Sequence, residues 1–342
     1  MNAGKILLQL RTVGIAAAGV AVFHGLSLPL PWLLGPMFAC VVAALLGLNL
    51  VGQPVVSAAM RTVLGVAAGA AITPALIGEL DDMALSLSFI PLFIVLSGLL
   101  GYPYFRRVWG YDKATSYYAA MPGGLQDMII FGEEAGGSPR VLSLVHVTRV
   151  LLVVSLVPFV IVLTTGASLD GPLGEPAASL PLWELILMVA IAGMGWWAAA
   201  AIGLFGASIL GPLALAAAAA LSGILLHRPP EEALFAAQFF IGLGVGVKYA
   251  GITPRELRNV VLAALGHVLI LVAIAAMFAE IVIVIGATTP LNAMLAFAPG
   301  GQGEMIVLAL AVGADVAFVV AHHVTRIVTV IVCAPLARRW LQ

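Results

Sequence analysis

Charged residues are scarce in this sequence: Asp, Glu, Lys and Arg make up only 9% of its 342 residues. Hydrophobic residues make up 62%, and the mean hydropathy is +1.14. A soluble domain carries about 25% charged residues, so this chain has too little polar surface for a water-soluble globule. The 15 basic residues nearly balance the 16 acidic ones, which excludes the basic excess that nucleic-acid binding requires. We therefore expect an integral membrane protein that contacts the lipid bilayer and does not bind nucleic acid.

Cysteine is equally rare. The two cysteines, Cys40 and Cys333, lie in apolar runs, which excludes a disulfide framework and a CxxC metal site. Copper and iron centres need clustered histidines and carboxylates, yet the six histidines form no HxH or HxxxH pair. We therefore expect no bound metal and no cofactor, and we do not expect an enzyme.

Polar stretches long enough for a soluble domain are absent as well. The apolar segments cover residues 6–24, 32–51, 55–78, 84–104, 114–131, 141–165, 182–204, 207–226, 234–250, 259–287, 291–312 and 316–337. The polar interval 166–181 separates six of these segments from the other six. We interpret residues 1–165 as a first membrane repeat, residues 166–181 as an external linker and residues 182–342 as a second membrane repeat.

The two halves share a duplicated sequence. Residues 121–158 align with residues 298–335 without a gap, at a constant offset of 177, and 12 of the 38 positions are identical. The shared motifs are Pro-Gly-Gly at 122–124 and 299–301, and His-Val-Thr-Arg at 146–149 and 323–326. A repeated tetrapeptide with three polar members inside an apolar run is not a chance similarity. The chain therefore consists of two homologous halves.

The number of membrane crossings in each half decides whether the repeats are parallel or inverted. If all six segments of each half cross, Lys248, Arg255 and Arg258 lie outside, against the positive-inside rule. If segments 114–131 and 291–312 instead enter and leave on one side, the basic loops become cytoplasmic and the acidic loops external. We therefore predict an all-α polytopic membrane protein with two inverted repeats. Each repeat has five transmembrane helices and one re-entrant or broken Pro-Gly-Gly segment, and both termini are cytoplasmic.

The Pro-Gly-Gly segments are the candidate substrate site. Pro removes a backbone donor and Gly has low helix propensity, so each helix should break there. A broken backbone at membrane depth is tolerated only where it is buried in protein or lines a wet cavity, and secondary transporters bind substrates at such breaks. The substrate-binding candidates are Arg149, Arg326, His146, His323, Gly123, Gly124, Gly300, Gly301, Gln126 and Gln302. The candidates for ion coupling or ion pairing are Asp127, Glu304, Thr148 and Thr325.

The two arginines allow two interpretations. Each lies about eight to ten residues into its apolar run, where a cation is costly and needs a partner. In the first interpretation Arg149 pairs with Asp127, and Arg326 pairs with Glu304, as buried struts that hold the broken segments. In the second, at least one guanidinium binds an anionic substrate with two hydrogen bonds, while a carboxylate or a histidine carries the coupled proton. The interpretations are compatible, since a substrate anion could replace a carboxylate that has taken up a proton.

These motifs resemble those of a known family. A duplicated Pro-Gly-Gly with an acidic residue and Met three and four positions after its last Gly, followed by HVTR in the next helix, resembles the AbrB family of Gram-negative membrane proteins. The resemblance covers essentially the whole chain. Members are often labelled as an ammonia monooxygenase or as a membrane AbrB regulator, and the resemblance implies an inner-membrane location.

The favoured function is secondary active transport of a small anionic, carboxylate-like solute across the inner membrane, coupled to a proton or sodium gradient. One alternative is a channel-like pathway for ammonia or ammonium, which would not need Arg149. Another is an indirect regulator of gene expression that acts through a transported metabolite, because the chain has no soluble domain to reach DNA. The partners expected are a small-molecule or ion substrate, the lipid bilayer and a second copy of the chain in a homodimer.

Overall fold

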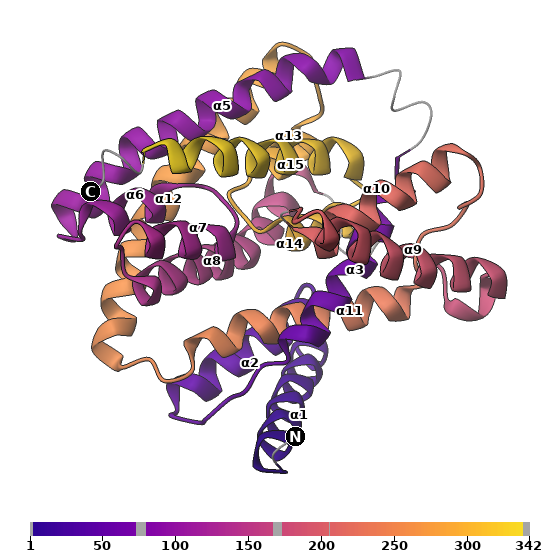
Figure 1. The fold of residues 1–342 in the computed structure, drawn as a ribbon, viewed down its shortest axis with the longest axis horizontal. Coiled ribbons are helices and arrows are strands. Elements are labelled where there is room, and N and C mark those ends of the chain that lie inside the picture. The colour runs from indigo at the N-terminus through magenta and orange to yellow at the C-terminus, as the bar shows by residue number, and fades with distance from the viewer. Residues whose placement is uncertain (1–2, 73–79, 167–172, 205, 338–342) are drawn as a thin grey trace. The chain divides into compact units, whose positions relative to one another are not determined.

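A computed structural model describes residues 3–72, 80–166, 173–204 and 206–337 (Figure 1). All regular structure in these ranges is helical. Residues 167–172 of the predicted linker lie outside the described residues. The rest of the linker contains one short 3-10 turn, Ala177–Ser179.

The helices follow the predicted apolar segments closely. The helices of the first half are α1 (Ala3–Gly25), α2 (Pro31–Leu45), α3 (Pro54–Ala70), α5 (Leu80–Pro103), α6 (Lys113–Ala120), α7 (Leu125–Glu134) and α8 (Pro139–Thr165). The helices of the second half are α9 (Leu182–Ala201), α10 (Ala207–Leu221), α11 (Glu231–Gly246), α12 (Pro254–Val284), α13 (Pro290–Phe297), α14 (Gln302–Ala311) and α15 (Val316–Cys333). Short turns of other helix types follow α5, α11 and α15.

Both Pro-Gly-Gly segments are broken helices, as the sequence predicts. Residues 121–124 separate α6 from α7, and residues 298–301 separate α13 from α14. We call these segments break 1 and break 2. The four flanking helices begin and end at positions that match at the offset of 177. The N-caps match too, because Asp112 accepts from Thr115 N in α6 and Thr289 accepts from Asn292 N in α13.

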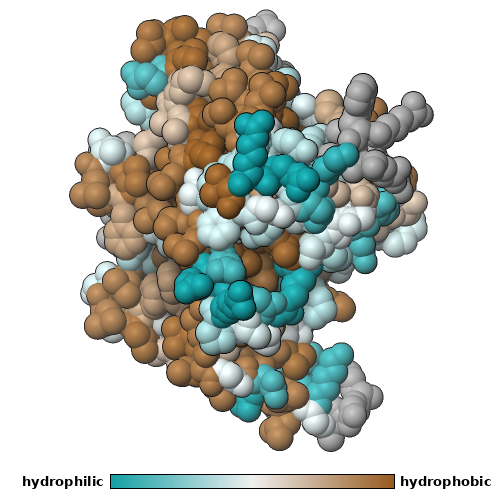
Figure 2. Space-filling view, turned by 90° about the vertical axis from the view of Figure 1, so that its left-hand side faces the viewer, coloured by the Kyte–Doolittle hydropathy of each residue, from teal (hydrophilic) through white to brown (hydrophobic). Residues whose placement is uncertain are grey.

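The protein is a multi-pass membrane protein. Six described helices are long and apolar enough to cross a bilayer: α1, α5, α8, α9, α12 and α15. Shorter apolar helices accompany them, among them α2, α3 and α10. Large apolar side chains are exposed along the helices; Leu163 of α8 is 83% exposed and Trp197 of α9 is 74% exposed. Figure 2 shows one face on which hydrophobic residues make up much of the surface, as contact with lipid requires.

The chain folds into two compact units, and each unit contains helices from both halves. The first unit consists of Met1–Leu80, Ala167–Gly251 and Ile306–Ala317, and therefore holds α1 to α3 and α9 to α11. The second unit consists of Asp81–Gly166, Ile252–Met305 and Phe318–Gln342, and holds α5 to α8, α12, α13, most of α15 and the start of α14. Corresponding helices of the two repeats thus share a unit, except that most of α14, the counterpart of α7, belongs to the first unit.

Close glycine contacts hold the first unit together in matched pairs. A Cβ on Gly65 of α3 would collide with the carbonyl of Ile209 in α10, and a Cβ on Gly242 of α11 would collide with the carbonyl of Leu33 in α2. Gly69 and Gly246, one turn later, face α10 and α2 in the same way. Small residues let helix backbones approach this closely in membranes. Each half therefore packs its third helix against the second helix of the other half.

In the second unit, α6 and α7 form a hairpin whose two ends lie together. The backbone N–H of Ser138, at the start of α8, donates to Oγ1 of Thr115 in the first turn of α6 over 2.8 Å. Ser138 also caps α8 by accepting from Val141 N. The chain thus enters break 1 through α6 and returns through α7 to the level at which it entered.

Candidate functional site

His146 on α8 supplies the hydrogen that Pro122 lacks. In a continuous helix the carbonyl of Tyr118 would accept from the N–H of residue 122, but proline has none. The Nε2 atom of His146 lies 3.1 Å from this carbonyl oxygen. A carbonyl can only accept, so Nε2 carries the hydrogen. His146 is fully buried, and it closes the end of α6 where the backbone cannot.

Arg149, one turn after His146, holds the backbone of break 1. Its Nη1 donates to the carbonyl of Met121 over 3.1 Å, and its Nη2 donates to the carbonyl of Gly123 over 3.0 Å. The planar guanidinium spans carbonyls two residues apart, which a point-like ammonium does less well. Arg149 is only 3% exposed, so this charge lies inside the protein against backbone dipoles.

The second copy repeats this arrangement contact by contact. His323 Nε2 lies 2.9 Å from the carbonyl of Leu295, whose helical donor would be Pro299. Arg326 donates from Nη1 to Ala298 over 2.7 Å and from Nη2 to Gly300 over 3.0 Å. In both copies the His and the Arg three residues later therefore contact carbonyls at or next to the same break.

The copies differ in one hydrogen bond. Nη2 of Arg326 lies 2.9 Å from Nδ1 of His323, whereas Nδ1 of His146 is buried without a hydrogen-bond partner among the described residues. The Nε atoms of both arginines are buried and also have no hydrogen-bond partner there. Among the described residues, the His–Arg pair at break 1 therefore has one more buried nitrogen without a hydrogen-bond partner than the pair at break 2.

The arginines have other partners than the strut interpretation gives them. Their terminal nitrogens donate to carbonyls of the breaks and not to the carboxylates of the same repeat. Oδ2 of Asp127 is buried and has no hydrogen-bond partner within the described ranges. The physical reason is that a broken helix leaves several carbonyls unpaired at one place, and these outnumber the single nearby carboxylate.

The acidic residues occupy the first turns of the helices that leave the breaks. Asp127 lies in the first turn of α7 and is 8% exposed, and Glu304 lies in the first turn of α14 and is half-buried. A Cβ on Gly301 would collide with Oε2 of Glu304, so this carboxylate folds back over the start of its helix. A helix N-terminus attracts anions through its free N–H groups and its dipole, so both carboxylates lie where an anionic ligand would bind.

Both breaks lie against α15. Arg326 on this helix binds break 2, and Val330, one turn later, contacts break 1. A Cβ added to Gly123 would approach Cγ1 of Val330 to 2.7 Å. A single turn of α15 therefore connects the two copies of the site.

The remaining predicted residues are less clearly engaged. Gln302 begins α14, and its Nε2 is buried with no hydrogen-bond partner among the residues that the structure describes. The side chain of Gln126 lies outside the described part. Thr148 is buried and Thr325 is half-buried on the helices of the two arginines. Gly124 is the N-cap of α7.

Two buried polar groups belong to the second unit and were not selected from the sequence. His322 contacts Ser86 on α5, and His267 on α12 is fully buried between aromatic rings of Tyr104 and Phe105. No spacing or motif distinguishes them, since their partners lie on helices far away in the sequence.

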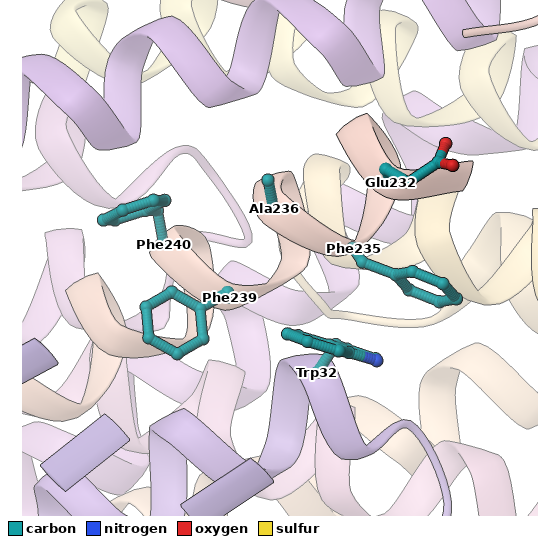
Figure 3. A pocket seen from close by; sticks show the side chains of 6 residues that line it. All are labelled: Trp32, Glu232, Phe235, Ala236, Phe239 and Phe240. Atoms are coloured by element: carbon teal, nitrogen blue, oxygen red, sulfur yellow. The ribbon is translucent and has the colours of Figure 1, made fainter. Parts of the chain in front are cut away.

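One hollow of about 370 Å³ lies in the first unit, between α11 and the start of α2 (Figure 3). Its lining residues are Trp32, Glu232, Phe235, Ala236, Phe239 and Phe240. The rings of Trp32 and Phe235 stack with centroids 5.4 Å apart. None of the residues predicted from the sequence lines it.

Across the described residues, no three His, Cys, Asp or Glu side chains gather into a group that could hold a metal ion.

Comparison with known proteins agrees with the duplicated motifs. The model of a protein family described as "Transition state regulatory protein AbrB" matches residues 32–342. The chain belongs to the AbrB family. It is 27% identical to a Bacillus subtilis (strain 168) protein named uncharacterized protein YhjN, with 97% of this chain and 92% of that protein covered. It is 25% identical to an Escherichia coli (strain K12) protein provisionally named regulator AbrB, with 94% and 92% covered. The resemblance to this family is thereby confirmed.

Proposed function

We propose that the chain is a secondary active transporter of a small anionic, carboxylate-like solute, driven by a proton or sodium gradient. The observation that carries the proposal is the duplicated break. Each copy combines an arginine, the N-terminus of a short helix and a carboxylate in its first turn, next to backbone that no longer forms a helix. Sites of this kind, built from discontinuous helices, bind substrates in secondary transporters.

Charge balance suggests how coupling would work. Each break has one buried arginine and one carboxylate, so the charges compensate while the carboxylate is ionised. When Asp127 binds a proton, the positive charge of Arg149 and the N-terminus of α7 lose this compensation. An anion of similar size can then occupy the same region, because its charge restores the balance. Proton and anion would therefore bind together.

The hairpin contact supports the proposed topology. In the proposed topology, the bond between Ser138 and Thr115 keeps both ends of the α6–α7 hairpin on one side, and the other five apolar helices of the first half cross the membrane. The equivalent positions of the second half are Asp315 and Asn292. With five crossings per half, the second repeat is inverted, and both termini lie in the cytoplasm. We place the protein in the cytoplasmic (inner) membrane, where coupled carriers operate, as a homodimer.

The regulator name of the Escherichia coli relative fits this proposal as an indirect effect. A carrier changes the concentration of a solute inside the cell, and gene expression responds to that solute. Such a mechanism needs no nucleic-acid contact, in accord with the balanced charge of the chain.

The test is current recording on purified protein in liposomes on a solid-supported membrane. Carboxylates, inorganic anions and ammonium are applied in turn, with and without proton and sodium gradients. We expect a saturable current with at least one anion, dependent on one of the two gradients. Asp127→Asn, which is nearly isosteric and cannot release a proton, should abolish that dependence, whereas Glu133→Gln at the exposed end of α7 should not.

Two results would contradict the proposal. One is an ammonium current without any anion current, which favours the channel-like pathway. The other is an anion current that persists unchanged in Asp127→Asn and in Glu304→Gln. The folding controls are incorporation of each variant into lipid nanodiscs and its elution as a single species in size-exclusion chromatography.

A further inference from the structure

His322 on α15 is a fully buried histidine with a complete set of contacts. Its Nδ1 lies 2.8 Å from the carbonyl of Phe318, one turn earlier in the same helix. Its Nε2 lies 3.0 Å from Oγ of Ser86 on α5. The hydroxyl of Ser86 in turn lies 2.9 Å from the carbonyl of Met83. All four groups belong to the second compact unit.

Counting hydrogens shows that all three contacts are hydrogen bonds at the same time only if the ring carries an extra proton. Carbonyl oxygens only accept, so Nδ1 of His322 must donate to Phe318 and Ser86 must donate to Met83. The single hydroxyl hydrogen of Ser86 is then used, and the contact between Nε2 and Oγ requires a hydrogen on Nε2. A ring with hydrogens on both nitrogens is an imidazolium. Neutral His322 can keep the contact only if Ser86 turns its hydrogen away from Met83 and toward Nε2.

We propose that His322 and Ser86 form a proton-binding site at the contact of α15 with α5. In the protonated state, Nε2 donates to Ser86 and Ser86 donates to Met83. When the proton leaves Nε2, its lone pair accepts from Ser86, whose hydroxyl reverses direction, while the bond from Nδ1 to Phe318 is kept. One proton and one hydroxyl rotation thus describe both states. That this proton drives transport rests on the function proposed above.

The surroundings can accept a charged ring. The ring of Phe318 lies 4.2 Å from that of His322 between centroids, and the ring of Phe297 lies 5.6 Å away. Both are within the distance at which an aromatic face stabilises a cation. Burial away from water opposes the charge, whereas the hydrogen-bond acceptors and the aromatic rings favour it.

Few other titratable groups belong to the helices around His322. On α15 they are His323 and Arg326, whose bonds to break 2 are described above, and the exposed Cys333 at the end of the helix. The sequence of α13 contains none. Near Ser86, α5 contributes Asp81 and Asp82 in its first turn, and their side chains lie outside the described part. On α12, Glu280 is exposed and His267 is buried, and Arg255, Glu256 and Arg258 lie near the start of the helix.

The site is adjacent to break 2 and has no counterpart at break 1. His323, the next residue, closes the end of α13, and Phe297, which contacts the ring of His322, is the last residue of that helix. At the offset of 177, the position of His322 corresponds to Val145. Protonation would therefore act on one of the two copies, which gives the otherwise duplicated site a difference between its halves.

The test is a nuclear magnetic resonance titration of protein labelled with ¹⁵N-histidine in lipid nanodiscs. The shifts of the ring nitrogens distinguish the imidazolium from each neutral form, and His322→Gln assigns the signal. We expect one buried ring to change between imidazolium and the neutral form with hydrogen on Nδ1. Ser86 bonds to both forms of the ring but more strongly to the charged form, so Ser86→Ala should lower the midpoint by about half to one pH unit. Ser88→Ala is the matched control, since Ser88 makes the same local bond to Leu85 but is exposed.

The proposal is overturned if His322 stays neutral across the accessible pH range, or if its neutral form carries hydrogen on Nε2. An unchanged midpoint in Ser86→Ala would overturn it as well. The first two outcomes need only the assigned wild-type signal, so they do not depend on whether Ser86→Ala folds. The titration needs no substrate, so a negative titration contradicts the proton site and does not contradict the proposed transport. In the same way, absent anion currents contradict the proposed transport and do not decide whether His322 binds a proton.

Discussion

At the scale of single residues, the His-Val-Thr-Arg motif replaces missing backbone donors. Proline removes the N–H that would close α6, and His146 provides an equivalent hydrogen from the next helix. Arg149 then pairs with two carbonyls beyond the end of the helix. Unpaired carbonyls at membrane depth cost several kcal/mol each, which explains why a buried arginine is tolerated there.

This account predicts an energetic coupling between His146 and Pro122. We expect His146→Leu to cost about 1–3 kcal/mol of stability, because a buried carbonyl loses its donor. In a Pro122→Ala background the backbone N–H returns and the cost of His146→Leu should fall. A double-mutant cycle measured by reversible unfolding in detergent checks this. Pro158→Ala, within α8, is the control that should not couple to His146, and equal costs in both backgrounds would argue against donor replacement.

A second residue-scale prediction concerns pH and the loop between α10 and α11. Nδ1 of His227 lies 2.7 Å from Oε2 of the buried Glu184. This hydrogen bond raises the pKa of His227 above its ordinary value. The stabilisation is therefore fully present below the ordinary pKa and is lost as pH rises through the raised one. The difference in melting temperature between wild type and His227→Ala should be larger at about pH 6 than at about pH 9. His24→Ala, at an exposed histidine, should show no such dependence, and a difference that grows with pH would reverse the assignment.

At the scale of helices, matched glycines set the contacts of the first unit. Gly65 and Gly242 face carbonyls of α10 and α2 at equivalent places, while Gly193 on α9 has nothing within 4 Å of an added Cβ. Glycine therefore permits a close helix contact at Gly65 and Gly242 but makes no such contact at Gly193. Where the facing backbone is this close, a methyl group must push two helices apart.

We expect Gly65→Ala and Gly242→Ala to lower thermal stability to a similar extent, because their contacts are equivalent. Gly193→Ala should instead raise it slightly, since Ala is favoured over Gly in a helix interior by roughly 0.5–1 kcal/mol. Melting of the three variants in one detergent provides the measurement. A strong loss in only one of the two matched variants would show that the halves do not pack equivalently.

At the scale of the whole molecule, each compact unit takes matching helices from both sequence halves. Neither half contains the partner of its own third helix, because α3 packs on α10 and α11 packs on α2. Cutting the chain within residues 166–181 should therefore give two fragments that fold together and not alone. Co-expression followed by co-purification checks this, and a stable, monodisperse first half by itself would contradict it.

The proposed topology makes a further prediction at this scale. With inverted repeats, Arg107 and Arg255, both exposed, lie on the same side of the membrane; with parallel repeats they lie on opposite sides. Cysteines introduced at these two positions, in a background without Cys40 and Cys333, should be labelled from the same side by a membrane-impermeant reagent. Labelling from opposite sides would remove the basis for the inverted arrangement.

The sequence by itself determined a large part of this protein. Its lack of charge required a membrane protein, its apolar runs predicted the positions of the helices, and Pro-Gly-Gly predicted both breaks. The constant offset predicted that the same residue types stand at equivalent positions around both breaks. These features follow from local chemistry, since hydrophobicity and the missing N–H of proline act wherever they occur in the chain.

Only the tertiary structure decided what the polar residues contact. One of the two interpretations paired Arg149 with Asp127, but Arg149 donates to backbone carbonyls, and backbone oxygens have no signature in a sequence. Ser86 and His322 meet from helices 236 positions apart, and neither lies in a motif that names the other. The grouping of matching helices from both halves into one unit was equally hidden, because helices find partners through packed surfaces that periodicity alone does not identify.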